Sequence, residues 1–211
     1  MSVVTITRQF GAGGSRVAGL VAEALGWSLV DNEFVDAVAR RAGLPPETVA
    51  AKEERGPSLM ERLVRALASA SPETFVPSAA TGEEREEERM VRVTERVIAE
   101  AAVHGRVVLV GRAGQFVLGS TTPEGALHVY VVAPRALRVR TVMEREGLDE
   151  AAAGELADRT EAARDRYVDR WYKRRRQDPV NYHMVLNSGW LGYDGAAALV
   201  IAAARGRGWT A

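Results

Sequence analysis

Residues 3–18 read VVTITRQFGAGGSRVA and combine an apolar run with a cluster of glycines. The run contains Val3, Val4 and Ile6, whose β-branched side chains are typical of a buried parallel strand. After the glycines, apolar residues recur at the spacing of one helix face, namely Val17, Leu20, Val21, Ala24 and Leu25. The sequence therefore predicts a strand that leads into a helix through a glycine-rich turn.

This glycine-rich turn has the properties of a phosphate-binding loop. Gly11, Gly13 and Gly14 permit positive φ and let backbone N–H groups approach an anion, while the helix N-terminus adds partial positive charge. The loop departs from the pattern G-x-x-x-x-G-K-S/T, because Gly14 stands at the lysine position and Arg8 at that of the first glycine. Two interpretations are open: a phosphate-binding loop, or a turn whose small residues let a helix pack closely on a sheet.

Composition narrows the function classes. The 211 residues suffice for one domain with a substantial core, and the 28 basic and 28 acidic residues balance, so the global positive charge of a nucleic-acid-binding protein is missing. The absence of cysteine excludes disulfides and thiol chemistry, and only three histidines, His104, His128 and His183, make a histidine-rich metal site unexpected. The N-terminus does not resemble a signal peptide and no apolar run has membrane-spanning length. We expect a cytoplasmic protein without a membrane partner.

Strand-like runs alternate with helical patterns along the chain. We expect strands at 3–7, 27–31, 106–111, 127–133 and 183–187, and helices near 14–25, 33–42, 136–146, 150–172 and 194–205. This alternation predicts an α/β fold with a parallel five-stranded sheet and helices on both faces. Ligands of such sheets bind at the carboxyl ends of the strands. This rule selects Arg8 to Ser15, Asp31 to Glu33, Arg112 and Asn187.

Two segments depart from a simple alternation of strands and helices. Residues 43–105 are too long for one crossover, which suggests an inserted helical lobe. Residues 158–179, DRTEAARDRYVDRWYKRRRQDP, mix many arginines with acids and aromatic side chains. They could bind nucleic acid, form an exposed helix with paired charges, or close over nucleotide phosphates. The interleaved acids weaken the nucleic-acid interpretation, because they would repel phosphates along the same face.

Four stretches, in this order, resemble the cytidylate-kinase-like family, a divergent branch of the P-loop nucleoside monophosphate kinases: ITRQFGAGGSRVAGLVAEALGWSLVDNEFV, VVLVGRAGQFVL, LHVYVVAPRALRVRTVMERE and DRYVDRWYKRRRQDPVNYHMVLNSGWLG. The resemblance implies a single kinase-like domain with a core at 1–42, 106–146 and 181–211, a monophosphate-binding lobe at 43–105 and a lid at 147–180. It also implies transfer of the γ-phosphoryl group from ATP, with Mg²⁺, to CMP, dCMP or a related small acceptor. The alternative is a nucleotide-binding regulatory module without kinase activity.

The resemblance, together with the chemistry of phosphoryl transfer, nominates site residues. ATP contacts are expected from Arg8, Gly11, Ala12, Gly13, Gly14, Ser15 and Arg16, with the Ser15 hydroxyl also reaching Mg²⁺. Acceptor contacts are expected from Asp31, Glu33, Arg112 and Arg166, where Arg112 matches the GR of the family's GRD motif. Catalytic cations are expected at Arg16, Arg112, Arg159 and Arg164. Small-molecule nucleotides, and no nucleic acid, are the expected partners.

Structural roles compete with several of these assignments. Helix capping is a serious alternative for Asp31, and each lid arginine is equally suited to an ordinary helix salt bridge. Asp178, before Pro179, fits a turn somewhat better than a base contact, and Asn187 could contact adenine or cap the next helix. Ala113 stands where the family's GRD motif has its acid, so one polar contact expected of cytidylate kinases is absent.

Overall fold

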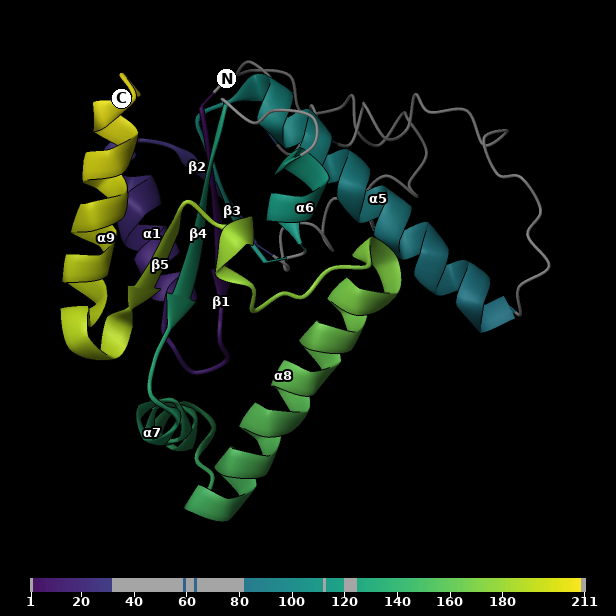
Figure 1. Ribbon diagram of the computed structural model, residues 1–211, viewed down its shortest axis with the longest axis vertical. Coiled ribbons are helices and arrows are strands. Elements are labelled where there is room, and N and C mark those ends of the chain that lie inside the picture. The colour runs from purple at the N-terminus through teal and green to yellow at the C-terminus, as the bar shows by residue number, and fades with distance from the viewer. Residues whose placement is uncertain are drawn as a thin grey trace, which may run out of the picture.

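The computed structural model describes residues 2–31, 59, 63, 82–111, 113–119 and 125–209, which build one parallel sheet with helices on both faces (Figure 1). The strands are β1 (Val3–Arg8), β2 (Ser28–Val30), β3 (Val107–Val110), β4 (Ala126–Val132) and β5 (Met184–Asn187). Their order across the sheet is β2-β3-β1-β4-β5, and every neighbouring pair runs parallel. The predicted α/β fold with a parallel five-stranded sheet is confirmed.

The helices form two covering layers and one group beyond the strand ends. Helices α1 (Gly14–Leu25) and α9 (Ser188–Gly206) pack on one face, and α5 (Gly82–His104) and α6 (Gly114–Gly119) pack on the other. Helices α7 (Arg135–Glu146) and α8 (Glu150–Tyr172) lie past the carboxyl ends of the strands (Figure 1). The short 3₁₀ helix η2 (Pro179–Asn181) leads back into β5.

The central strand β1 divides its side chains between two apolar cores. Val4 and Ile6 belong to the core under α1 and α9, whereas Val3 belongs to the core under α5 and α6. Both cores exclude water, so the strand is buried on both faces, as its continuous apolar run predicts. This packing fixes the carboxyl end of β1, and therefore the start of the glycine loop, relative to its neighbours.

Most predicted elements are present with small changes at their ends. Helices predicted at 14–25, 136–146 and 150–172 correspond to α1, α7 and α8. Helix α9 begins at Ser188 rather than near 194, because Asn187 caps it and the kink at Gly192 (φ 69°) lies within it. Helix α6 was not predicted, since its six residues are too few to show a periodic pattern.

The helix predicted at 33–42 and much of the lobe predicted at 43–105 lie outside the described residues. Helix α5 is the longest described part of that lobe, and Leu63 packs beside it in the second core. The division of the chain into core, lobe and lid stays a prediction. None of the described helices combines the length and the apolar character needed to cross a membrane.

Candidate active site

The glycine loop joins the end of β1 to the start of α1 and leaves backbone donors at its surface. Gly13 precedes the helix with φ 73° and supplies no side-chain cap, so the first N–H groups of α1 have no intrahelical acceptor. These groups lie at a cavity of about 610 Å³, here called the loop cavity, whose lining includes Gly13, Gly14, Ser15 and Arg16. Partial positive charge at this helix end favours an anion there.

The structure explains why no lysine stands in this loop. A Cβ atom added to Gly14 would collide with the Cβ of Arg8, so this position has no room for a longer side chain. Gly13 is equally restricted, because the ring of Tyr193 packs directly over it. The two departures from the usual loop pattern are therefore coupled: Arg8 fills the space that a side chain at position 14 would need.

A second cavity of about 280 Å³, here called the middle cavity, lies where the ends of β1 and β3 meet α8. Its polar lining includes Thr7, Arg8, Gln115, Arg164 and Arg176, and none of the described residues that line it is a carboxylate. Three arginines therefore line this cavity, while the acids that pair with two of them, Glu161 and Asp165, are not part of its lining. Its chemistry is suited to an anionic group.

A chain of hydrogen bonds begins at Thr7 and Gln115, which line the middle cavity, and continues through Tyr182 to the backbone of Arg176. Thr7 Oγ1 donates to Gln115 Oε1 (2.9 Å), and Gln115 Nε2 donates to the Tyr182 hydroxyl (3.1 Å). The Tyr182 hydroxyl in turn donates to the carbonyl oxygen of Arg176 (2.6 Å). These buried groups are satisfied by one another, which fixes their positions.

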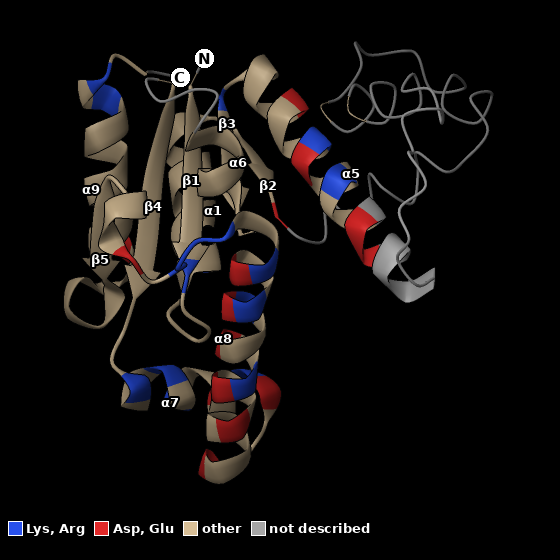
Figure 2. Cartoon of the chain, turned by 45° about the vertical axis from the view of Figure 1, so that its right-hand side comes forward, with Lys and Arg blue, Asp and Glu red and all other residues tan. Residues whose placement is uncertain are grey.

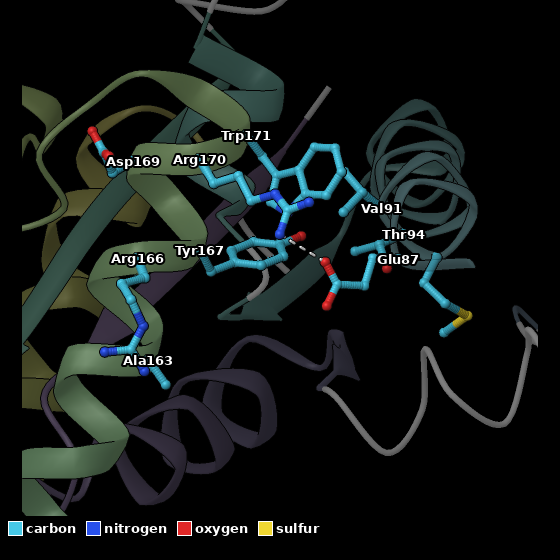
Figure 3. Close-up of a pocket in the computed structure, with 10 residues that line it drawn as sticks. Glu87, Val91, Thr94, Ala163, Arg166, Tyr167, Asp169, Arg170 and Trp171 are labelled. Carbon is cyan, nitrogen blue, oxygen red and sulfur yellow. Dashed lines mark ion pairs between the residues drawn. The ribbon is translucent and has the colours of Figure 1, made fainter. Parts of the chain in front are cut away.

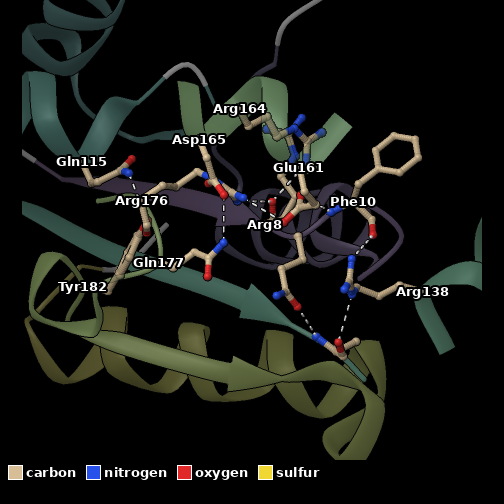
Figure 4. Close-up of polar contacts among 12 residues, drawn as sticks. Arg8, Phe10, Gln115, Arg138, Glu161, Arg164, Asp165, Arg176, Gln177 and Tyr182 are labelled. Carbon is tan, nitrogen blue, oxygen red and sulfur yellow. Dashed lines mark hydrogen bonds and ion pairs between the residues drawn. The ribbon is translucent and has the colours of Figure 1, made fainter. Parts of the chain in front are cut away.

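Two arginines from α8 and the segment after it hold the end of β1 (Figure 4). Arg164 Nη1 and Arg176 Nη1 both donate to the carbonyl oxygen of Arg8, at 3.1 and 3.3 Å. Arg176 is only 4% exposed and forms ion pairs with Glu161 (2.8 Å) and Asp165 (2.7 Å). Arg164 has a longer ion pair with Glu161, at 3.4 Å.

The pKa shifts of these two arginines differ in sign. Burial alone would lower the pKa of Arg176, but the hydrogen bond and charge of Glu161 raise it above its usual value. Burial lowers the pKa of Arg164, and Glu161 offsets this only in part. The charge of Arg176 is thus compensated within the protein, whereas that of Arg164 is compensated only in part. Arg164 is the arginine that an added anion would stabilise more.

A third cavity of about 820 Å³, here called the groove, separates α5 from α8 (Figure 3). Met90, Val91 and Thr94 line it from α5, and Arg166, Arg170 and Trp171 line it from α8. An ion pair between Arg170 Nη1 and Glu87 Oε2 (3.1 Å) joins the two helices across it.

The three cavities are neighbours along α8 and share lining residues. Arg8 and Arg164 line both the loop cavity and the middle cavity, so they stand at the boundary between the two. Ala163 and Tyr167 line both the middle cavity and the groove. A ligand at the glycine loop and a second ligand extending into the groove would therefore meet beside Arg164.

The structure gathers only some of the predicted site residues. Arg8, the glycine loop from Gly11 to Arg16 and Arg164 surround the loop cavity, with Ala12 buried beneath it. Arg166 lines the groove, while Arg159 is exposed on α8 and, like Asp31 after β2, lines none of the three cavities. Glu33 and Arg112 lie outside the described residues. The roles of all these residues stay predictions.

The structure shows which backbone groups the side chains of Asp178 and Asn187 contact. The Asp178 side chain accepts from the amide of Val180 and caps η2, as expected of a turn former. The Asn187 side chain accepts from the amide of Gly189 and caps α9. Both side chains therefore satisfy backbone donors.

Sequence reasoning missed three residues at the centre of this arrangement, namely Phe10, Gln115 and Glu161. Glu161 and Asp165 are four residues apart, which puts both acids on one face of α8 beside Arg164, and this spacing was a usable signal. The other two gave none, since Gln115 lies in the unpredicted α6 and Phe10 acts through its backbone. Figure 2 shows acidic and basic residues alternating along the visible side of α8.

The comparisons with known proteins concern the family and the fold. The model of the cytidylate kinase-like family matches residues 3–189. An uncharacterized protein from Eubacterium ventriosum superposes with a TM-score of 0.70 at 20% identity, covering 97% of this chain and 99% of that one. Shikimate kinase from Acinetobacter baumannii, in complex with shikimate, gives a TM-score of 0.51 at 13% identity over 98% and 94% of the two chains. A gluconokinase from Sinorhizobium meliloti gives 0.50 at 15% identity over 97% and 94%. At these identities the likeness shows the fold alone.

A curated relative matches a smaller part of the chain. A uronate isomerase of Corynebacterium glutamicum is 35% identical over 113 residues, which are 54% of this chain and 21% of that protein. The chain therefore spans about a fifth of the length of this relative.

Proposed function

This chain belongs to the cytidylate kinase-like family, and we propose that it transfers the γ-phosphoryl group of ATP to a nucleoside monophosphate such as CMP or dCMP, or to a related small acceptor. One observation carries the proposal. The loop cavity, with its helix amides, lies next to the arginine-lined middle cavity, and Arg8 and Arg164 line both. Phosphoryl transfer needs this kind of arrangement, with two anions brought together by cations.

The loop cavity is the proposed donor end. The N–H groups of Gly13, Gly14, Ser15 and Arg16 would bind donor phosphates, and the exposed Ser15 hydroxyl is an oxygen ligand of the kind that Mg²⁺ accepts. In the described parts of the chain no three acids or histidines gather to hold a metal, so Ser15 would share the ion with phosphate oxygens and water. When bound, Mg·ATP supplies the phosphoryl group.

The middle cavity and the groove are the proposed acceptor end. Arg164 would hold the anionic group of the acceptor, while Arg176, whose nitrogens already donate to Glu161, Asp165 and the Arg8 carbonyl, keeps its structural contacts. The groove would take the rest of the acceptor beside Tyr167 and Trp171. Asp31, Glu33, Arg112 and Arg166 keep their predicted acceptor roles as part of this proposal.

Arg164 is the proposed contact to the phosphoryl group in transfer. It borders both cavities, it is partly buried, and its charge is incompletely compensated, so added negative charge in the transition state would stabilise it. Arg16, which lies over the ring of Tyr193 at the edge of the loop cavity, would act on the donor phosphates. Arg112 and Arg159 complete the proposed set of catalytic cations.

A regulatory module that binds nucleotide without transferring phosphate is the second candidate. The observation that favours it is Gly14, which replaces the loop lysine at a position where no lysine can fit. Such a lysine contributes to transition-state stabilisation in P-loop enzymes. Among the residues that the structure describes at the loop cavity, the cationic side chains are arginines: Arg8, Arg16, Arg145 and Arg164.

The experiment is an assay of the purified protein with Mg·ATP and a panel of nucleoside monophosphates, followed by detection of ADP and diphosphate products. The kinase should turn over at least one acceptor, and Arg164→Ala should lower kcat by about 100-fold or more, as expected for loss of one transition-state donor. Arg174→Ala, which changes an exposed arginine outside all three cavities, is the matched control. Clear ATP binding without turnover of any acceptor would favour the regulatory module, and absence of both would overturn both candidates.

A further inference from the structure

The residues that lead into the glycine loop are hydrogen-bonded both to α7 and to α8 with the segment after it. The Phe10 carbonyl oxygen accepts from Arg138 Nη1 of α7 (3.4 Å), and the Arg8 carbonyl oxygen accepts from Arg164 and Arg176. The Phe10 ring lies beneath two guanidinium groups, those of Arg145 (4.7 Å from its centroid) and Arg164 (5.4 Å). The loop and the helices beyond the strand ends therefore form one connected unit.

The carboxylate of Glu161 joins these contacts to one another. Its Oε1 accepts from the Phe10 amide (2.9 Å) and from Arg164 Nη1 (3.4 Å), and its Oε2 accepts from Arg176 Nη2 (2.8 Å) (Figure 4). The Glu161 side chain is only 13% exposed and lines none of the three cavities. It is thus linked to the loop and to both arginines without facing a ligand.

We propose that Glu161 is the positioning residue of this site, which fixes α8 against the glycine loop through Phe10 and aims Arg164 at the boundary between the loop and middle cavities. The proposal rests on the proposed function, in which Arg164 contacts the transferred group. In this proposal Glu161 acts by positioning Arg164, and Glu161 itself does not contact the substrate.

The charges around Glu161 explain why this carboxylate is needed. Arg164 and Arg176 both point at the Arg8 carbonyl, and the positive charge of Arg176 is among the causes that lower the pKa of Arg164. Without the carboxylate between them, the two guanidinium groups would repel each other at close range. Arg176 would keep its ion pair with Asp165, so Arg164 is the group that would move.

The test compares Glu161→Gln with Glu155→Gln, which changes an exposed acid on the same helix. Glutamine keeps an oxygen for the Phe10 amide but removes the charge that holds the arginines. We expect kcat to fall about 10-fold to 100-fold in Glu161→Gln, with the KM of the acceptor little changed, as for displacement of a catalytic group by about 1 Å. Glu155→Gln should behave as the unchanged protein does. An equal loss in both variants, or a rise in KM at unchanged kcat, would overturn the proposal.

A double-mutant cycle separates positioning from a general structural role. If Glu161 acts through Arg164, then Glu161→Gln should cause no further loss in the Arg164→Ala background, whereas additive losses would overturn the proposal. If the unchanged protein turns over no acceptor, the proposed function fails. The cycle is then measured on the Kd of Mg·ATP, since Arg164 also lines the loop cavity, and additive losses again overturn the role of Glu161.

Discussion

At the scale of single residues, Arg8 and Gly14 show what a sequence motif can hide. The sequence shows that the loop lacks its lysine and has an arginine where the first glycine is usual. It does not show that these are one change, because the contact joins the end of β1 to the start of α1 in space. The Arg8 side chain packs on Gly14, so a lysine restored at position 14 would compete with it for the same volume.

Gly14→Ala should therefore destabilise the protein, although alanine favours helices. The added Cβ meets the Cβ and Cγ of Arg8, which are close to the backbone and cannot swing away as a flexible side-chain end can. Overpacking of this kind costs about 1–3 kcal/mol of unfolding free energy, which guanidinium unfolding would measure. Gly19→Ala is the matched control in the same helix, where the Cβ meets nothing within 4 Å. There we expect a gain of up to about 1 kcal/mol. A Gly14→Ala variant as stable as Gly19→Ala would contradict this account.

At the scale of elements, the range of α8 was predicted correctly, but the directions in which its arginine side chains point were not. Its predicted range, 150–172, agrees with the structure, but its predicted arginines have different surroundings: Arg159 is exposed, Arg164 borders two cavities and Arg166 lines the groove. A helix turns by about 100° per residue, so arginines five apart, such as Arg159 and Arg164, differ in direction by about 140°. Without a core pattern to fix the rotation of α8, the sequence could not show which arginine faces the loop.

The contacts that hold α8 in place are also distant in sequence. The hydrogen bond from the Phe10 amide to Glu161 joins residues 151 positions apart, and that from Arg176 to the Arg8 carbonyl joins residues 168 positions apart. Local periodicity predicted the individual strands and most helices, because each of these elements is a run of neighbouring residues in the chain. It carries no information about such pairs, and the centre of the candidate site consists of them.

Arg176 should contribute more to stability than any other arginine on or after α8. Replacing it with Met leaves Glu161 and Asp165 without their buried partner and removes a donor from the Arg8 carbonyl. Because Glu161 keeps Arg164 and the Asp165 side chain is 38% exposed, we expect a cost of about 1.5–3 kcal/mol, typical of lost hydrogen bonds to charged groups. Thermal or guanidinium unfolding of Arg176→Met should show a loss of this order, while Arg174→Met, at an exposed position, should change stability by less than about 0.5 kcal/mol. Equal stability of the two variants would show that the Arg176 ion pairs are not formed.

At the scale of the whole molecule, the sheet buries a histidine, His128, that lines none of the three cavities described above. His128 lies in β4 with 5% of its surface exposed, hydrogen-bonds through Nδ1 to Thr5 Oγ1 (2.8 Å) and stacks on His183 with centroids 5.0 Å apart. Its Nε2 is buried without a hydrogen-bond partner among the described residues. A second proton on this ring would therefore have to be accommodated in the dry interior of the sheet.

This histidine should make the stability of the fold depend on pH below neutrality. Burial, together with the neighbouring His183, lowers the pKa of His128 to about 4, whereas in the unfolded chain it is about 6.5. The unfolded state then binds more protons between these values, so stability is complete above about pH 6.5 and falls as the pH drops toward 4, by roughly 3 kcal/mol in total.

Guanidinium unfolding at a series of pH values would measure this dependence. His128→Gln, which cannot titrate, should flatten the fall in stability between pH 6.5 and 4, whatever its effect at neutral pH. His104→Gln, at an exposed position in the last turn of α5, should keep the full slope. Because acids with ordinary pKa values protonate at the lower end of this range, the slope between pH 6.5 and 5 is the informative part. An unchanged slope there in His128→Gln would mean that His128 is protonated as easily in the folded protein as in the unfolded chain.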